Sequence, residues 1–318
     1  MEKPVIRISV RNLVEFILRN GDLESGGTAG DKEAMLKGSR LHRKIQKQMG
    51  SHYQAEVSLK KDTEYEDLIL RVEGRADGIF TQNEKICIDE IKGVYKNLEL
   101  LAEPVLVHRA QALCYAWIYL DDHGLEEIDV QMTYAHLDTE MIKRFRETMT
   151  REELESWYQR LLDSYHKWLS YQMKWREERN RSMEKLEFPF IYRKGQKEMV
   201  AGIYHAISRK EQIFIQAPTG VGKTMSAVFP AVRSIGEGKA ETLFYLTART
   251  ITRTVAQDAF EILRKNGLLF KTVTITAKEK LCFCEKPECN PETCPYAKGH
   301  YDRSTDAVYE LWTDEQSF

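Results

Sequence analysis

The 318-residue chain has no apolar run long enough to cross a membrane and no apolar segment behind its first methionine. A membrane-spanning helix needs about 20 largely apolar residues, and a signal peptide needs a shorter apolar core near the N-terminus. Internal repeats and low-complexity tracts are also missing. We therefore expect a protein that has no membrane span, is not secreted and resides in the cytoplasm.

An excess of positive charge is missing as well. The 47 Lys and Arg residues are balanced by 49 Asp and Glu residues, which gives a formal net charge of -2. A protein that binds a polyanion through its overall charge would be strongly basic. Any affinity for nucleic acid must therefore come from local patches. One candidate is the polar side of a predicted helix, with Arg40, Arg43, Lys44 and Lys47.

The order of predicted elements indicates two α/β domains joined by a long helix. Before residue 140, short β-type runs alternate with helices at Met35–Met49 and Val107–Leu120. The sequence Thr150-Arg151-Glu152-Glu153 is a capping box, which predicts the start of a charged helix reaching Arg181. Beyond residue 186, strand–helix–strand alternation predicts a parallel sheet with strands at Ile213–Ile215, Thr242–Leu246 and Thr272–Thr276.

A glycine-rich turn follows the apolar run at residues 213–215. It reads Ala-Pro-Thr-Gly-Val-Gly-Lys-Thr over residues 217–224 and leads into an apolar helical segment. In such a turn the backbone N–H groups face a phosphate, Lys223 reaches the β- and γ-phosphates, and the Thr224 hydroxyl binds Mg²⁺. A plain strand–turn–helix corner is the alternative, but it does not require Lys-Thr after the second glycine. Gly220, Gly222, Lys223 and Thr224 are thus predicted to bind a nucleoside triphosphate.

A second group of polar residues lies on two predicted strands of the first domain. Alternation along Asp89-Glu90-Ile91-Lys92 puts Glu90 and Lys92 on one face and Asp89 on the other. A hairpin turn near Asn83 would bring the carboxylate of Asp77 within reach of that of Glu90. Paired carboxylates suit Mg²⁺ or Mn²⁺, and a neighbouring lysine can stabilise charge on a phosphate. A solvated Glu–Lys pair is the ordinary alternative.

The order of these residues resembles the RecB-like branch of the PD-(D/E)xK nucleases over residues 10–135. The matching pattern is Gly-x3-His, Gly-x2-Asp, Glu-x-Lys and Gln-x3-Tyr, with the glycines at positions 38 and 74. By this resemblance His42, Asp77 and Glu90 would bind Mg²⁺ or Mn²⁺, and Asp77, Glu90 and Lys92 would be catalytic. Gln111 and Tyr115 would line the DNA path. A nuclease fold that binds DNA without cutting it remains an alternative.

Four of the six cysteines cluster at Cys282, Cys284, Cys289 and Cys294. In a chain without a signal peptide, such a cluster is more typical of a metal site than of disulfides. Four thiolates can bind either one zinc ion or a [4Fe–4S] cluster. The residue chemistry slightly favours zinc and leaves both open.

Residues 186–318 resemble the DinG/XPD iron–sulfur DNA helicases of superfamily 2. The resemblance depends on a Phe-Pro-Phe-x-Tyr-Arg-x-Gly-Gln entry, the Ala-Pro-Thr-Gly-x-Gly-Lys-Thr turn, and a cysteine-bearing insertion that starts near residue 278. It implies ATP bound with help from Arg193 and Gln196, and single-stranded DNA held by Thr247, Arg249 and Thr250. It also implies movement from 5′ to 3′ and a [4Fe–4S] cluster at the four clustered cysteines.

The sequence as a whole predicts an ATP-dependent DNA helicase fused to a Mg²⁺- or Mn²⁺-dependent nuclease that acts in DNA repair or processing. The expected domains are a nuclease (1–140), a helical linker (141–185) and the first part of a RecA-like motor domain (186–318). A zinc-binding P-loop ATPase with an inactive nuclease fold is the alternative. Because no second acidic ATPase motif follows the glycine-rich turn, we expect the sequence to be part of a longer chain.

Overall fold

The structure is a computed structural model that describes residues 3–23, 32–248, 253–285 and 288–314. The chain forms two compact units: Met1–Trp168 with Thr276–Trp312, and Leu169–Ile275 with Thr313–Phe318. The long helix α4 (Arg151–Glu184) contributes residues to both units. Across the described ranges, no helix combines the length and apolar character that a membrane crossing requires.

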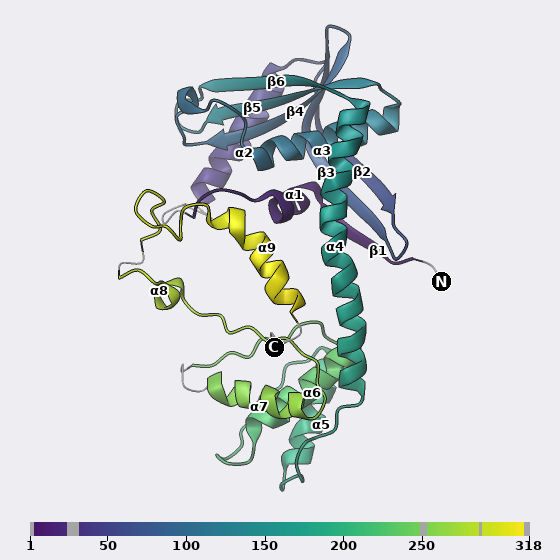
Figure 1. The fold of residues 1–318 in the computed structure, drawn as a ribbon, viewed down its shortest axis with the longest axis vertical. Helices are drawn as coiled ribbons and strands as arrows, with labels where there is room; N and C mark the ends of the chain where they lie inside the picture. Colours follow the sequence, from purple (N-terminus) through teal and green to yellow (C-terminus); the bar gives the residue numbers. More distant parts are fainter. Residues whose placement is uncertain (1–2, 24–31, 249–252, 286–287, 315–318) are drawn as a thin grey trace. The chain divides into compact units, whose positions relative to one another are not determined.

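The first unit is built on a six-stranded mixed sheet (Figure 1). Its strands are β1 (Val5–Ser9), β2 (Gln54–Glu64), β3 (Ile69–Gln82), β4 (Lys85–Val94), β5 (Glu127–His136) and β6 (Ile142–Thr150). The order is β1-β3-β4-β5-β6, with β2 paired along the other edge of β3. The β1–β3 and β4–β5 pairs are parallel, and the other pairs are antiparallel. The chain therefore has the predicted mixed α/β character.

The β3–β4 hairpin confirms the predicted turn near Asn83. Asn83 and Glu84 both have positive φ, at 50° and 66°. Two left-handed central residues suit the right-handed twist of a two-residue hairpin. The pairing of Gln82 with Lys85 fixes the register, so that Gly78 lies opposite Asp89.

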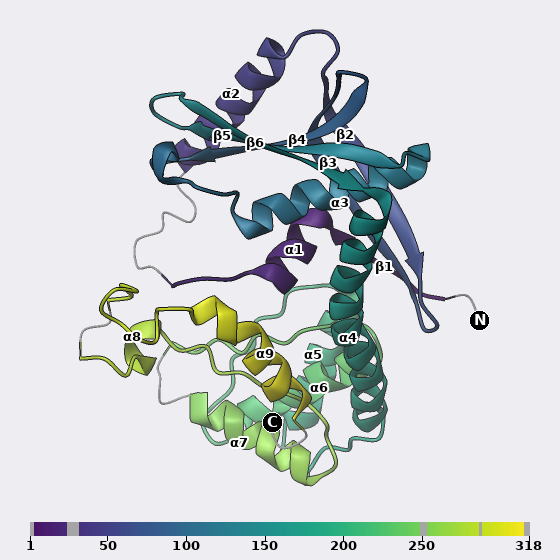
Figure 2. The same ribbon diagram turned by 45° about the horizontal axis from the view of Figure 1, so that its top comes forward.

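Helices cover both faces of this sheet (Figure 2). Helices α1 (Val10–Leu18) and α3 (Leu106–His123) lie on one face, and α2 (Lys32–Gln48) lies on the other. Leu41 and Ile45 of α2 pack against Ile91 and Ala135, as the four-residue apolar spacing predicts. A short 3₁₀ helix, η1 (Leu98–Leu100), precedes α3.

The start of α4 follows the predicted capping box. The Thr150 N–H donates to Glu153 Oε2 at 2.9 Å, and the Glu153 N–H donates to Thr150 Oγ1 at 3.4 Å. These reciprocal bonds satisfy backbone donors that the first helical turn leaves unpaired.

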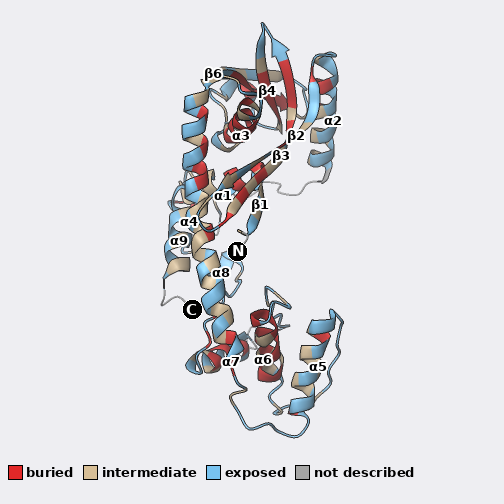
Figure 3. Ribbon diagram, turned by 90° about the vertical axis from the view of Figure 1, so that its right-hand side faces the viewer, coloured by how far each residue is buried: buried red, intermediate tan, exposed pale blue. Residues whose placement is uncertain are grey.

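The second unit contains α5 (Gln196–Arg209), α6 (Lys223–Gly236) and α7 (Arg253–Lys265). Its core combines Val228, Val232 and Ile235 of α6 with Phe260 and Leu263 of α7, and Figure 3 shows most of α6 as buried. Helices α8 (Lys278–Leu281) and α9 (His300–Thr313) lie in the cysteine-bearing part of the chain, of which residues 276–312 belong to the first unit.

The three strands predicted for the motor are not formed. Residues 213–215, 242–246 and 272–276 have no regular secondary structure, and apolar side chains there are exposed, including Phe214 (93%), Leu246 (88%) and Ile275 (86%). A strand of a parallel sheet depends on hydrogen-bonded neighbours and on helices over both faces. An apolar run specifies an extended segment, but it does not supply these neighbours.

Candidate functional site

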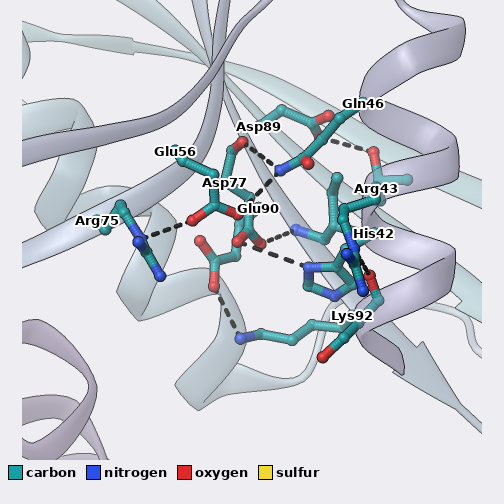
Figure 4. Close-up of polar contacts among 12 residues, drawn as sticks. His42, Arg43, Gln46, Glu56, Arg75, Asp77, Asp89, Glu90 and Lys92 are labelled. Atoms are coloured by element: carbon teal, nitrogen blue, oxygen red, sulfur yellow. Dashed lines mark hydrogen bonds and ion pairs between the residues drawn. The ribbon is translucent and has the colours of Figure 1, made fainter. Parts of the chain in front are cut away.

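The candidate site lies at a gap in the pairing of β3. On one edge, β1 pairs with Ile69–Glu73 and β4 pairs with Gly78–Gln82, so residues 74–77 have no strand beside them there. Backbone groups in such a gap need other partners. Side chains from α2, β3 and β4 meet at this place (Figure 4), and Gln111 of α3 is hydrogen-bonded to Lys92 there.

Tyr115 of α3 closes one part of the gap. Its hydroxyl lies beside the main chain of Gly74 and Arg75. A Cβ atom at Gly74 would lie only 2.7 Å from the Tyr115 hydroxyl oxygen, which is closer than a real Cβ contact. Gly74 therefore allows the tyrosine to reach the strand.

Asp77 bridges the point where β3 and β4 separate. Its Oδ2 accepts a 2.7 Å hydrogen bond from the Ile91 N–H, and its Oδ1 lies 3.7 Å from His42 Nδ1. Asp77 and Glu90 are the next residues beyond the last recorded β3–β4 pair, Gly78–Asp89. The predicted proximity of the Asp77 and Glu90 side chains follows from this register.

Glu90, Lys92 and Gln111 form a second part of the site. Lys92 Nζ lies 2.8 Å from Glu90 Oε1 and donates a 2.6 Å hydrogen bond to Gln111 Oε1. Burial raises the pKa of Glu90 to about 7, against the lowering effect of Lys92. The other carboxylate oxygen of Glu90, Oε2, is buried and has no hydrogen-bond partner among the described residues. Buried polar atoms rarely lack a partner, so this oxygen is a position that a ligand could fill.

The donor atoms suit a divalent cation. His42, Asp77 and Glu90 offer one imidazole and two carboxylates, which Mg²⁺ and Mn²⁺ accept. In the part of the chain that the structure describes, no three His, Cys, Asp or Glu side chains already form a group that could hold an ion. The unpartnered Glu90 oxygen is the feature that fits a cation here.

Three further residues at the site were not predicted. Gln46 Nε2 donates to the Asp77 main-chain oxygen at 2.9 Å and to Glu56 Oε1 at 3.2 Å, while Arg75 Nε lies 2.6 Å from Glu56 Oε2. Glu56 has a positive φ of 58° and lies between the pairs Ala55–Gly78 and Val57–Ala76. Gln46 follows His42 by one helical turn, a spacing that places both on one helix face and could have been noticed.

Asp89 lies apart from this group, as strand alternation predicts. Its carboxylate is fully buried and accepts hydrogen bonds from Thr133 Oγ1 (2.6 Å), Gln131 Nε2 (3.1 Å) and the Tyr53 hydroxyl (3.1 Å). Three donors satisfy a buried carboxylate without a metal ion.

The glycine-rich turn of the second unit forms its own site. Gly220 and Gly222 have positive φ angles of 83° and 78°, and α6 begins at Lys223, as predicted. Lys223 Nζ donates to the carbonyl oxygens of Ala217 (3.0 Å) and Pro218 (2.7 Å). The lysine ammonium group therefore lies within the glycine-rich turn. The Thr224 hydroxyl oxygen lies 3.4 Å from the Tyr245 hydroxyl.

Gln196 and Arg193 both contact the backbone of this turn. Gln196 Nε2 donates to the Val221 carbonyl at 3.1 Å, and its Oε1 accepts from the Arg193 N–H at 3.0 Å. The Arg193 guanidinium donates to the Gly220 carbonyl. The two residues predicted to assist nucleotide binding therefore lie beside the glycine-rich turn.

Three of the four clustered cysteines, Cys282, Cys284 and Cys294, lie near one another. Cys284 Sγ and Cys294 Sγ are 3.9 Å apart, and Cys282 is near enough to affect the Cys284 thiol. The backbone N–H groups of Ala297 and Tyr296 near the Cys294 sulfur lower the pKa of this thiol. The hydrogen bond with Cys294 raises the pKa of Cys284 to about 11.

The structure gives little information on the residues predicted to bind single-stranded DNA. Thr247 lies in a segment without regular secondary structure, and Arg249 and Thr250 lie outside the described residues.

Comparisons with known proteins bear on the second half of the chain. Residues 193–284 match the DEAD/DEAH box helicase family. A solved structure titled "Crystal structure of SSO0001" is 19% identical, covers 49% of this chain and 75% of its own, and has a TM-score of 0.33. No curated protein matches the sequence. The matched residues, which are less than a third of the chain, include the lysine-bearing glycine turn, so this segment is similar to DEAD/DEAH box helicases of superfamily 2.

Proposed function

We propose that this chain is an ATP-dependent DNA helicase of the DinG/XPD type whose residues 1–140 are a metal-dependent nuclease. The DEAD/DEAH match supports the helicase part. One observation supports the nuclease part above the others: the buried Glu90 carboxylate has an unpartnered oxygen beside Lys92 and the His42–Asp77 pair.

In the motor, the start of α6 would bind the triphosphate. The backbone N–H groups of the turn and the positive end of the helix dipole both favour a phosphate at Lys223. The ammonium group would exchange the Ala217 and Pro218 carbonyls for phosphate oxygens. Thr224 would hold Mg²⁺, which neutralises phosphate charge when bound.

In the nuclease, His42, Asp77 and Glu90 would hold Mg²⁺ or Mn²⁺. Such an ion activates water and neutralises phosphate charge when bound. Lys92 would stabilise the charge that develops on the phosphate during cleavage, because Glu90 and Gln111 hold its ammonium group at the site. Gln46 would fix Asp77 by binding its main-chain oxygen.

The four clustered cysteines would bind a [4Fe–4S] cluster, with zinc as the alternative. The 3.9 Å Cys284–Cys294 separation lets one thiol donate a hydrogen bond to the other. It is also close to the separation of about 3.8 Å that Zn–S bonds of about 2.3 Å give two thiolates on one tetrahedral ion. Iron and zinc counts with an absorption spectrum of anaerobically purified protein distinguish the two centres.

Two lysine variants of the full-length protein separate the two activities. Lys92→Ala should abolish Mn²⁺-dependent cleavage of labelled single-stranded DNA and leave ATP turnover unchanged. Lys223→Ala should abolish ATP-dependent unwinding, with a loss of about 100-fold or more in ATP turnover, and leave cleavage unchanged. Lys96→Ala, an exposed lysine beyond the end of β4, is the control. Unchanged cutting by Lys92→Ala removes the nuclease proposal, and unimpaired unwinding by Lys223→Ala removes the motor proposal.

One observation favours a second candidate function for the first unit. Across the described ranges, no three ligating side chains are already grouped for an ion. A nuclease fold that only binds DNA would need no such group. Wild-type protein that binds single-stranded DNA but does not cut it with Mn²⁺ would establish this alternative.

A further inference from the structure

The cysteine segment, defined here as residues 288–312, contacts the end of α1 and the residues that follow it. Both belong to the first compact unit. The Leu23 N–H donates to the Ala297 carbonyl at 2.9 Å, and the Tyr301 N–H donates to the Gly21 carbonyl at 2.9 Å. Main-chain bonds between parts so distant in sequence indicate a specific contact.

Two aspartates reinforce this contact from opposite sides. Asp22 Oδ1 accepts a 2.6 Å hydrogen bond from the Gly299 N–H. Asp302 Oδ1 accepts a 2.8 Å hydrogen bond from the Gly21 N–H. Hydrogen bonds that involve a charged acceptor are roughly twice as strong as neutral ones. Each partner thus supplies one carboxylate and one backbone donor.

Aromatic side chains extend the contact along α9. The Arg19 guanidinium lies 3.8 Å from the centre of the Tyr301 ring. Trp168 of α4 makes edge contacts at 4.8 Å with both Phe16 and Tyr309. These contacts bury apolar surface between the cysteine segment and the rest of the first unit.

Ala297 connects this contact to the cysteines. Its N–H donates to the Cys294 main-chain oxygen at 3.1 Å, its carbonyl accepts the Leu23 N–H, and it is 1% exposed. Ala297 is therefore bonded to the main chain of Cys294 on one side and to Leu23, after α1, on the other. A change in the position of Cys294 must disturb the bond to Leu23, or the reverse.

We infer that metal binding at the cysteines and docking of the cysteine segment on residues 19–23 stabilise each other. Ordering a loop that carries metal ligands costs conformational entropy, and a docked loop has already met part of that cost. The coupling must be reciprocal, since each event favours the same conformation. This inference depends on the proposed cysteine metal centre and not on the nuclease or the ATPase.

Hydrogen exchange tests the first direction of the coupling. The metal content of the full-length protein is measured first, and exchange at the Gly21, Leu23 and Tyr301 amides is then compared before and after removal of the metal. We expect removal to speed exchange at all three amides by about tenfold or more. Unchanged exchange overturns the inference alone. Protein that never holds a metal overturns both the inference and the proposed centre.

An aspartate series tests the reverse direction. Asp302→Ala removes the acceptor of the Gly21 N–H and should speed release of the bound metal to a colorimetric chelator by several-fold. Asp302→Asn keeps an acceptor oxygen and should release the metal close to the wild-type rate. Asp306→Ala, an exposed aspartate on the same helix, is the control. Equal metal release from Asp302→Ala and the wild type overturns the coupling, even if the variant exchanges faster at Gly21.

Discussion

Replacing Lys92 with methionine removes a cationic partner of the buried Glu90 carboxylate. The Lys92 and Glu90 side chains are 22% and 6% exposed, and their charged atoms are 2.8 Å apart. At that distance the attraction is about 6 kcal/mol for an effective dielectric constant of about 20. Desolvation offsets part of it, and removing one partner of a buried pair costs about 3–5 kcal/mol. Because Glu90 has a pKa of about 7, its protonation limits the loss near neutral pH. We therefore expect Lys92→Met to destabilise the first unit by up to about 3 kcal/mol at pH 9.

The assay is native-state hydrogen exchange of the β4 amides in the full-length protein, with a chelator present to exclude divalent cations. Exchange in β4 reports the local free energy of opening, which is appropriate for a chain with two compact units. A double-mutant cycle adds Glu90→Gln, which neutralises the partner, and should recover at least about 2 kcal/mol in the double variant. Additive effects of the two substitutions would refute the argument that Glu90 depends on Lys92.

The remaining predictions concern two glycines and a histidine in the fold around the site. Gly78→Ala should destabilise the first unit by about 1–3 kcal/mol, because the new Cβ would lie 1.8 Å from the Tyr53 ring. A Cβ at Gly38 in α2 would meet no atom within 4 Å, so Gly38→Ala should stabilise the first unit by about 0.5–1 kcal/mol. Equal shifts of the melting temperature in the Gly78 and Gly38 variants would contradict this description of the packing. Burial lowers the pKa of His108 to about 4, so the native state binds fewer protons than the unfolded state between pH 4 and 6.5. The free energy of unfolding therefore decreases as the pH is lowered from 6.5 to 4, by up to about 3 kcal/mol. His108→Gln should remove this loss in urea unfolding. An NMR titration of His108 near pH 6.5 would contradict the prediction.

Local features of the fold could be predicted because nearby residues determine them. The capping box at Thr150 and the turn at Asn83 depend on side-chain chemistry within a few residues. The helix start at Lys223 likewise follows from the glycines before it. The approach of Asp77 to Glu90 then follows from the hairpin register.

Features that depend on distant partners could not be predicted. The gap along β3 exists because β1 pairs with Ile69–Glu73 and β4 pairs only from Gly78 onward. No local sequence pattern determines where these two pairings stop. The contact of Gly299 with Asp22 joins residues 277 positions apart. Phe214 lies in an apolar run that predicts a strand, yet the run lacks the strand partners it would need.

The decisive experiment measures cleavage of labelled single-stranded DNA together with ATP turnover in the same full-length preparations. We expect Mn²⁺-dependent cutting by the wild-type protein, and no cutting with undiminished ATP turnover by Lys92→Ala. Equal cutting by the two proteins, or no cutting by either, would contradict the assignment of the Asp77–Glu90–Lys92 site as a nuclease.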